Sequence, residues 1–388
     1  MDYFLTEEQK MIQDLARQIS EEKVLPVRAE LDEKEEFSHE ILKHFADSDL
    51  MGLNIPEEYG GMGMGVFEQV LATEQVARIC CGTAVTVASG GLGATPILLY
   101  GSEKQKQKYL PHVASGKKLT AFALTESTAG SDVSGIQTTA VREGNEYVLN
   151  GTKQWITNAG IAEIYCVIAI TDRSKGARGA SFFIVEKGDP GFDFGKKEKK
   201  MGIRTSVTGE LIFNDCRIPA DRLIGREGMG FIIAMKAFDL SRPGVGILGV
   251  GLSQGALEAA VEFAQTRIQF GRPIIAQQAV QHILADMATK IEASRALVYA
   301  VAKYLDSGAK DVSKVSAMAK LFSSDTAMQV TTDAVQIFGG HGYMREYPVE
   351  KMMRDAKILQ IFEGTNQIQR NIIGQELNKQ FSSRKKKR

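Results

Sequence analysis

The chain has 388 residues, enough for two or three domains and a large buried core. Its 47 lysine and arginine residues balance its 47 aspartate and glutamate residues, so the total charge gives no indication of a nucleic-acid partner. The four cysteines form no Cys-x-x-Cys pair, and the five histidines show no zinc spacing, so we expect reduced thiols and no metal site. No continuous apolar run reaches the roughly 18 residues of a membrane helix, and the N-terminus resembles no sorting signal, which predicts a cytoplasmic protein with no membrane partner.

Residues 1–118 show helical patterns. Thr6 with Gln9, and Ser102 with Gln105, have the spacing of capping boxes at the starts of two helices. Pro26 ends or bends the first helix. Further helices are predicted over residues 39–50 and 67–79. We therefore expect an N-terminal helical domain over residues 1–118.

Three glycines stand close together in an otherwise apolar stretch, at Gly90, Gly91 and Gly93. Inside a helix they would cost about 2–3 kcal/mol relative to alanine. A loop or a close helix crossing would explain them. A floor of small residues that widens a pocket would explain them equally well, and the sequence does not separate these alternatives.

Between residues 119 and 227 the pattern changes to β-branched and alternating runs separated by turn signals. No long helical pattern comes between the runs, which predicts an antiparallel sheet or small barrel rather than βαβ units. No Gly-x-Gly-x-x-Gly motif follows a strand, which argues against a Rossmann nucleotide site. The expected strands are residues 119–125, 138–141, 147–149, 164–170, 181–185 and 210–213.

The helical period returns over residues 228–388, which we expect to form a third, helical domain. Strong patterns cover residues 254–269, 278–305 and 315–337, and Gly339 and Gly340 end the last of these. The basic tail over residues 384–388 is interpreted as a solvated terminus rather than an interaction segment.

One carboxylate near the end of the chain stands out because of its neighbours. Glu363 directly precedes Gly364 and Thr365, and a helical, mostly apolar run follows. Glycine lets the backbone bend close to a ligand, and an apolar cavity raises the pKa of a carboxyl group toward that of a general base. An acidic residue at a helix start is more often a cap or part of a solvated face, so this local pattern alone leaves both readings open.

The surrounding segment, Ile-Phe-Glu-Gly-Thr-Asn-Gln-Ile-Gln-Arg at residues 361–370, resembles the Glu-Gly-Thr signature of the acyl-CoA dehydrogenases. Other motifs of that family occur earlier in the chain, in the expected order, so the resemblance covers nearly the whole chain. The resemblance implies an N-terminal helical domain, a middle β-barrel domain and a C-terminal four-helix bundle. It also implies that Glu363 removes the α-proton of an acyl thioester while the β-hydride passes to flavin N5, which yields a trans-2-enoyl-CoA.

Residues 122–132 leave a predicted strand and enter a turn rich in Gly, Ser and Thr, which exposes N–H and hydroxyl donors. The segment resembles the family motif Thr-Glu-Pro-x-Ala-Gly-Ser-Asp, and Ser127 replaces the usual proline without removing a donor. By this resemblance Phe122, Leu124 and Thr125 meet the flavin ring of FAD, and Ser131 meets a pyrophosphate or the CoA group. Residues 151–157 match a second family motif, which implies that Trp155 and Thr157 lie against the flavin. A single tryptophan is otherwise more often a core residue.

Two further motifs point to a site shared between chains. Arginines beside a glycine suit a diphosphate, because guanidinium groups bind phosphate oxygens in a fork. Residues 267–274 resemble the family's Arg-x-x-Phe-Gly motif, which reaches the FAD of a neighbouring subunit. The resemblance therefore implies a homo-oligomer, usually a tetramer. The residues implied here are Arg267, Gln269, Phe270 and Gln278, with Gln336, Gly339, Gly340, Thr365 and Gln367 also near FAD.

The substrate contacts implied by the resemblance are Asp239 and Arg242 for the CoA nucleotide, with Ser131 and Gly364 also beside the substrate. Some relatives carry the base just before the arginine of this helix. Here that position is Ser241, which cannot serve, so Glu363 is the only carboxylate in either family position.

The motifs look most like those of short-chain, butyryl-type members, although Gly90, Gly91 and Gly93 would also admit a branched or alicyclic acyl group. One methylene changes discrimination by only about 1–3 kcal/mol, so the sequence does not name the substrate. The family passes its electrons to an electron-transfer flavoprotein. A flavin oxidase or monooxygenase on the same fold, or a non-catalytic acyl-CoA-binding protein, are the alternatives.

Overall fold

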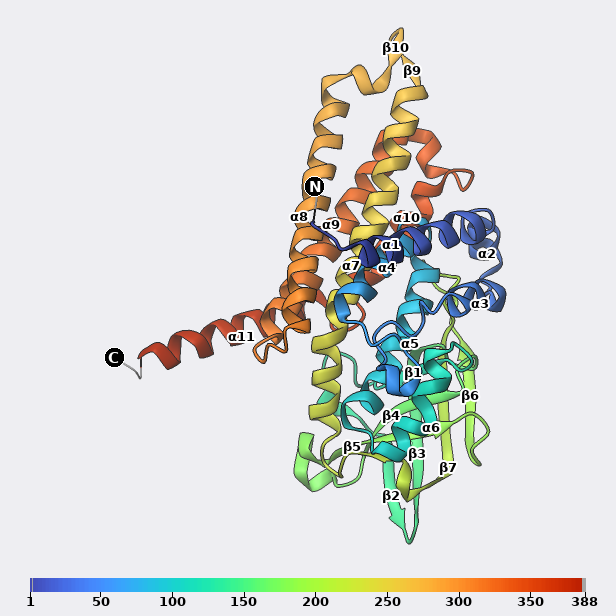
Figure 1. Ribbon diagram of the computed structural model, residues 1–388, viewed down its shortest axis with the longest axis vertical. Coiled ribbons are helices and arrows are strands. Elements are labelled where there is room, and N and C mark those ends of the chain that lie inside the picture. Colours follow the sequence, from blue (N-terminus) through green and yellow to red (C-terminus); the bar gives the residue numbers. More distant parts are fainter. Residues whose placement is uncertain (2, 386–388) are drawn as a thin grey trace.

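The computed structural model describes residue 1 and residues 3–385, so residues 386–388 of the basic tail lie outside the described part. Figure 1 shows long helices in the upper half, a β domain in the lower half and the first helices packed at one side. The helix α7 runs through both halves, and α11 projects from the body toward the C-terminus. The α-helices are α1 Glu7–Ile19, α2 Arg28–Lys34, α3 His39–Asp47, α4 Val66–Ile79, α5 Cys81–Tyr100, α6 Glu103–Ala114, α7 Gly230–Thr266, α8 Gln278–Asp306, α9 Ser313–Phe338, α10 Pro348–Leu359 and α11 Asn366–Lys385.

Local sequence chemistry sets several helix ends. The Thr6 hydroxyl accepts a hydrogen bond from the Gln9 N–H, and the Gln9 side chain accepts one from the Thr6 N–H, so the predicted capping box is confirmed. The box between Ser102 and Gln105 at the start of α6 is confirmed in the same way. Pro26 lies in the turn before α2, as expected. These ends are local in sequence, which is why the sequence predicts them.

The β domain is one sheet in the order β6-β7-β3-β2-β4-β5-β8, with β1 paired to β4. Most of the sheet pairs antiparallel, as expected, but β1 runs parallel to β4 from Thr120 opposite Ile164 to Ala123 opposite Val167. The β2–β3 hairpin lies between them in the chain and gives enough length for the crossover that a parallel pair needs. The strands are β1 Thr120–Ala123, β2 Thr139–Glu143, β3 Glu146–Thr157, β4 Ile164–Ile170, β5 Ala180–Glu186, β6 Phe192–Lys197, β7 Thr208–Pro219 and β8 Leu223–Ile224.

The glycines of α5 include one at a close crossing. A Cβ added at Gly93 would lie 2.3 Å from Thr120 Oγ1 and 2.8 Å from the Ala121 nitrogen, so α5 approaches β1 too closely for any larger residue. The Thr120 hydroxyl also donates a 2.7 Å hydrogen bond to the Gly90 carbonyl. The loop alternative is therefore wrong, since the segment is helical, and close packing accounts for Gly93.

Two of the described helices, α5 and α7, are long and apolar enough to cross a membrane by length and composition. The continuous-run criterion misses them, because glycine and hydroxyl residues interrupt their apolar residues. Within the fold, 65% of the apolar window of α5 and 67% of that of α7 are buried. Burial of this kind is what core helices show.

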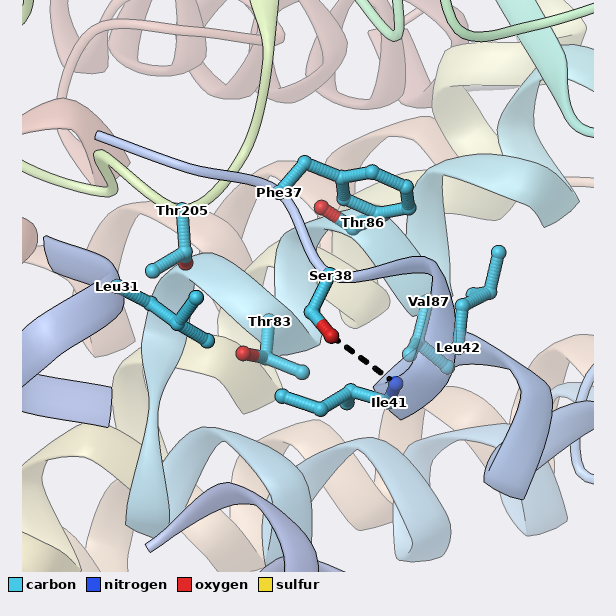
Figure 2. A pocket seen from close by; sticks show the side chains of 9 residues that line it. All are labelled: Leu31, Phe37, Ser38, Ile41, Leu42, Thr83, Thr86, Val87 and Thr205. Carbon is cyan, nitrogen blue, oxygen red and sulfur yellow. Dashed lines mark hydrogen bonds between the residues drawn. The ribbon is translucent and has the colours of Figure 1, made fainter. Parts of the chain in front are cut away.

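A small pocket separates α5 from the segment that joins α2 to α3 (Figure 2). Its cavity volume is about 10 Å³, which leaves room for about one water molecule. The Ser38 hydroxyl at its edge accepts a 3.2 Å hydrogen bond from the Ile41 N–H and so caps α3. The pocket is a packing gap and is too small for an acyl group.

Candidate active site

The segment around Glu363 is a tight turn between α10 and α11. Glu363 has φ 51° and Gly364 has φ 89°, so two successive residues adopt the left-handed conformation. Glycine takes this conformation at no steric cost, whereas a residue with a side chain pays about 1–2 kcal/mol. The predicted bend at Gly364 and the helix after it are confirmed. The strain at Glu363 was not predicted, and it must be held by contacts from elsewhere.

The Glu363 carboxylate points toward α7. The Ser241 hydroxyl donates a 2.6 Å hydrogen bond to Glu363 Oε2. Burial raises the pKa of Glu363, and the Ser241 hydrogen bond and the positive charges of Arg242 and Lys320 limit the rise. A carboxyl group whose pKa is raised by burial is a better proton acceptor than an exposed one.

Asp239 and Arg242 lie on the same helix and bind each other. Arg242 Nη1 donates a 2.7 Å hydrogen bond to Asp239 Oδ1, and the Ser313 hydroxyl of α9 donates to Asp239 Oδ2. Both side chains are buried, and Arg242 Nε has no partner among the described residues. The sequence suggested the pair but not the contribution of Ser313. The implied contact of this pair with a CoA nucleotide stays a prediction.

Trp155 is not a core residue. It lies at a β-bulge between β3 and β7 with φ 57°, and 54% of its surface is exposed. The Gln154 N–H beside it donates a 2.8 Å hydrogen bond to the Thr125 carbonyl. The bulge therefore turns the indole outward next to the loop that follows β1.

A buried ion pair fastens these two segments together. Lys153 Nζ lies 2.7 Å from Glu126 Oε1 and donates a second hydrogen bond, 3.1 Å long, to the Leu124 carbonyl. Glu126 also accepts from the N–H groups of Gln137 and Thr138 at 2.6 and 3.0 Å. Burial alone would raise the pKa of Glu126, but Lys153 and these donors outweigh burial and lower it. No motif in the sequence indicates this pair.

The side chains around this bulge suit a flavin. The exposed indole offers an apolar face, while partly exposed Thr125 and Thr157 and exposed Ser131 offer hydroxyl groups near the strand ends. Phe122 is partly exposed and packs against Phe182 and Phe238, with ring centroids 5.3 Å away in each case. The buried side chain of Leu124 leaves only its backbone for a ligand.

The other residues implied for FAD lie elsewhere in this chain. The hairpin of β9 (Ile268–Gln269) and β10 (Arg272–Pro273) forms the upper tip of the molecule, remote from the β domain (Figure 1). Phe270 at its turn is 95% exposed. One chain therefore does not bring this set together with Trp155. The exposed residues of this predicted FAD set are Arg267, Gln269, Phe270, Gln278, Gln336, Gly339 and Gly340.

Thr365 and Gln367 lie at the start of α11, close to Glu363 in the chain. Thr365 is partly exposed, and its hydroxyl accepts a 3.3 Å hydrogen bond from the Ile368 N–H, so it caps the helix. Gln367 is exposed. A local capping function therefore accounts for Thr365 without a ligand, and the FAD contacts of both residues stay predictions.

Two buried polar residues beneath the Glu363 turn were also missed. Lys320 lies on the buried face of α9, among serines and alanines at helical spacing, and Gln369 lies in the first turn of α11. A lysine within such a stripe of small residues is the signal that could have identified the first. The second has no comparable signal in the sequence.

Models of the three acyl-CoA dehydrogenase domains match this chain in order. The N-terminal domain matches residues 6–117, the middle domain residues 121–216 and the C-terminal domain residues 228–378. The chain belongs to the acyl-CoA dehydrogenase family. It is thus an oxidoreductase of a family whose members use FAD, and the helix–sheet–helix architecture expected from the resemblance is confirmed.

Individual relatives extend over nearly the whole chain. The acryloyl-CoA reductase (NADH) of Anaerotignum propionicum is 47% identical over 98% of this chain and 96% of its own length. The solved structure of butyryl-CoA dehydrogenase from Megasphaera elsdenii is 45% identical, with a TM-score of 0.95 and coverage of 97% of this chain and 100% of that one. A chain in the solved structure of the electron transferring flavoprotein of Acidaminococcus fermentans is 49% identical, with a TM-score of 0.95 and coverage of 97% and 99%.

Proposed function

We propose that this chain catalyses the α,β-dehydrogenation of a short-chain, branched or alicyclic acyl-CoA, with Glu363 as the base. The observation that carries the proposal is the placement of Glu363. Its carboxylate stands on a strained turn, its pKa is raised by burial, and Ser241 orients one of its two oxygens. This arrangement fits removal of a proton from the α-carbon of a thioester.

The residues of the chain would act in a defined order. The acyl chain displaces water, which raises the pKa of Glu363 further toward the operating pH. Hydrogen bonds to the thioester oxygen, including one from the Glu363 N–H, stabilise the charge that develops there, each by about 3–4 kcal/mol. One Glu363 oxygen then takes the α-proton, while Ser241 holds the other.

Trp155, Thr157, Thr125 and Ser131 would hold FAD, and bound FAD supplies the two-electron acceptor for the β-hydrogen. We propose that the residues at the upper tip reach the FAD of a second subunit, so the working protein is a homo-oligomer and, by family resemblance, a tetramer. The exposed, dispersed positions of these residues in one chain support this assignment.

The test is anaerobic bleaching of the oxidised-flavin absorbance by a panel of butyryl, hexanoyl, isobutyryl, glutaryl and cyclohexanecarboxyl thioesters. We expect rapid bleaching by a short-chain, branched or alicyclic member. Glu363→Gln should keep yellow FAD and lose turnover. Turnover at the wild-type rate in this variant would contradict the assignment of the base.

The similarity to an acryloyl-CoA reductase favours a second candidate, the same chemistry in the opposite direction. Here Glu363 would return a proton to the α-carbon of a 2-enoyl thioester, and the β-carbon would take a hydride from reduced FAD. Re-oxidation of the reduced protein by acryloyl-CoA, faster than butyryl-CoA bleaches the oxidised protein, would support this direction. Rapid peroxide formation in air would instead favour an oxidase.

We further propose that an electron-transfer flavoprotein takes the electrons. The similarity to the chain in the Acidaminococcus fermentans structure supports this partner. The measurement is the rate at which purified electron-transfer flavoprotein re-oxidises the bleached protein. A rate no faster than spontaneous re-oxidation would exclude this partner.

A further inference from the structure

Lys320 holds an uncommon position for a lysine. Its side chain is fully buried in α9, and among the described residues it forms no ion pair. Its ammonium group instead donates hydrogen bonds to the Gly364 carbonyl at 2.8 Å and to Asn366 Oδ1 at 2.9 Å. A buried cation without a carboxylate partner carries a large desolvation cost. We therefore ask what the buried position of Lys320 contributes to the site.

Gln369 of α11 also hydrogen-bonds to the Glu363–Gly364 turn. Its Nε2 donates to the Glu363 carbonyl at 3.1 Å and to the Gly364 carbonyl at 3.0 Å. The carbonyls of both left-handed residues are thus held by buried donors from two different helices. These contacts supply the outside support that the strained backbone at Glu363 requires.

Lys320 also faces the charges around the base. Burial, opposed by the negative charge of Glu363 and aided by the positive charge of Arg242, lowers the pKa of Lys320 to about 8. Asp325 opposes the change from the α9 side, and Arg242 itself is paired with Asp239. The charge of Lys320 in turn limits the rise in the pKa of Glu363.

We infer that Lys320 is a positioning residue for Glu363. Together with Gln369 it fixes the left-handed Glu363–Gly364 turn, and its positive charge favours the carboxylate form of Glu363. This inference rests on the proposed function for its kinetic consequence, whereas the effect of Lys320 on the carboxyl group is independent of turnover.

The experiment compares three flavin-loaded variants. Lys320→Met keeps the length of the side chain but removes its donors and charge. Gln369→Met removes the other donor without changing any charge. Lys314→Met, on the same helix but hydrogen-bonded to Gln380 at the surface, is the control. The Glu363 carboxyl group is titrated by infrared difference spectroscopy, with its band assigned by its loss in Glu363→Gln.

In Lys320→Met we expect the carboxyl titration to move up by about one pH unit. The kcat for butyryl-CoA at neutral pH should fall by about 10- to 100-fold while KM changes less than about threefold, because the base is displaced and not the binding surface. Gln369→Met should lower kcat without moving the titration. The control should change neither.

A Lys320→Met protein with the titration and the kcat of the control would overturn the inference. If Lys320→Met does not load FAD, the kcat values of Lys320→Arg and Gln369→Met test the inference instead. An unchanged kcat in both variants would overturn it. Because the infrared titration needs no turnover, a wild-type protein that no thioester bleaches would reject the proposed function alone, and the titration would still test Lys320.

Discussion

The Ser241 hydroxyl donates a 2.6 Å hydrogen bond to the Glu363 carboxylate across 122 positions of sequence. By the family resemblance, Ser241 occupies the position where some relatives carry the base. In this chain the Ser241 hydroxyl therefore supports the carboxylate of Glu363, which lies in the other family position.

Ser241→Ala should destabilise the carboxylate form of Glu363. A hydrogen bond to a charged group contributes about 1.5–3 kcal/mol, and its loss raises the pKa of Glu363. Because the base must be deprotonated, activity falls as the pH is lowered. In Ser241→Ala this loss should begin at a pH about one unit higher than in the wild type. The measurement is kcat/KM for butyryl-CoA from pH 5.5 to about pH 9.5.

Ser253→Ala is the matched control, since Ser253 is buried on the same helix and donates only to the Gly249 carbonyl. Its pH profile should match that of the wild type. An unchanged profile in Ser241→Ala as well would show that the hydrogen bond does not influence the base.

The single tryptophan makes flavin binding directly visible. Trp155 is the only tryptophan in the chain and is half exposed at the proposed flavin wall. We expect FAD added to the apoprotein to quench most of its fluorescence, because the two ring systems would be in contact. Trp155→Phe should still bind FAD, whereas Trp155→Ala should bind it at least about tenfold more weakly. Tryptophan emission unchanged at saturating FAD would place the flavin elsewhere.

The buried pair of Glu126 and Lys153 should show strong coupling. Removing one partner leaves a buried charge alone, so Lys153→Met should lower the free energy of unfolding by about 3–5 kcal/mol. Glu126→Gln should also be destabilising. The double variant should lose less than the sum of the two, and denaturant unfolding of all four proteins measures the difference.

The pH dependence gives this pair a second test. Because the folded state lowers the pKa of Glu126, its carboxylate stabilises the fold above the ordinary carboxyl range, and this contribution is lost as the pH falls through the lowered pKa. The destabilisation caused by Glu126→Gln should therefore shrink between pH 7 and about pH 3. A pH-independent difference would contradict the assignment of a charged Glu126.

The features that the sequence predicts are local ones. The Thr6 and Ser102 boxes and the bend at Gly364 depend on residues within three or four positions, so their chemistry is visible in the sequence. The strand β6 was missed because its Phe-Asp-Phe-Gly-Lys-Lys sequence ends in polar residues at the edge of the sheet.

The contacts that surround Glu363 are not local, and the sequence does not contain them in readable form. Ser241 and Lys320 reach it only because α7 packs against α9 and the turn lies over both helices. The family resemblance suggested Glu363 as the proposed base. It did not supply the donors beneath the turn, because these follow from packing rather than from a motif.

The exposed hairpin at the upper tip offers the test of assembly. Phe270 is 95% exposed at the turn between β9 and β10, and the proposed assembly has a second chain cover it. Phe270→Ser should therefore weaken the proposed homotetramer, seen by light scattering coupled to size-exclusion chromatography. It should also reduce FAD retention, because the same hairpin is proposed to reach the partner's flavin. Val141→Ser, which changes an exposed apolar residue of β2 in the β domain, should do neither. A wild-type protein that is monomeric yet fully loaded with FAD would contradict the shared site.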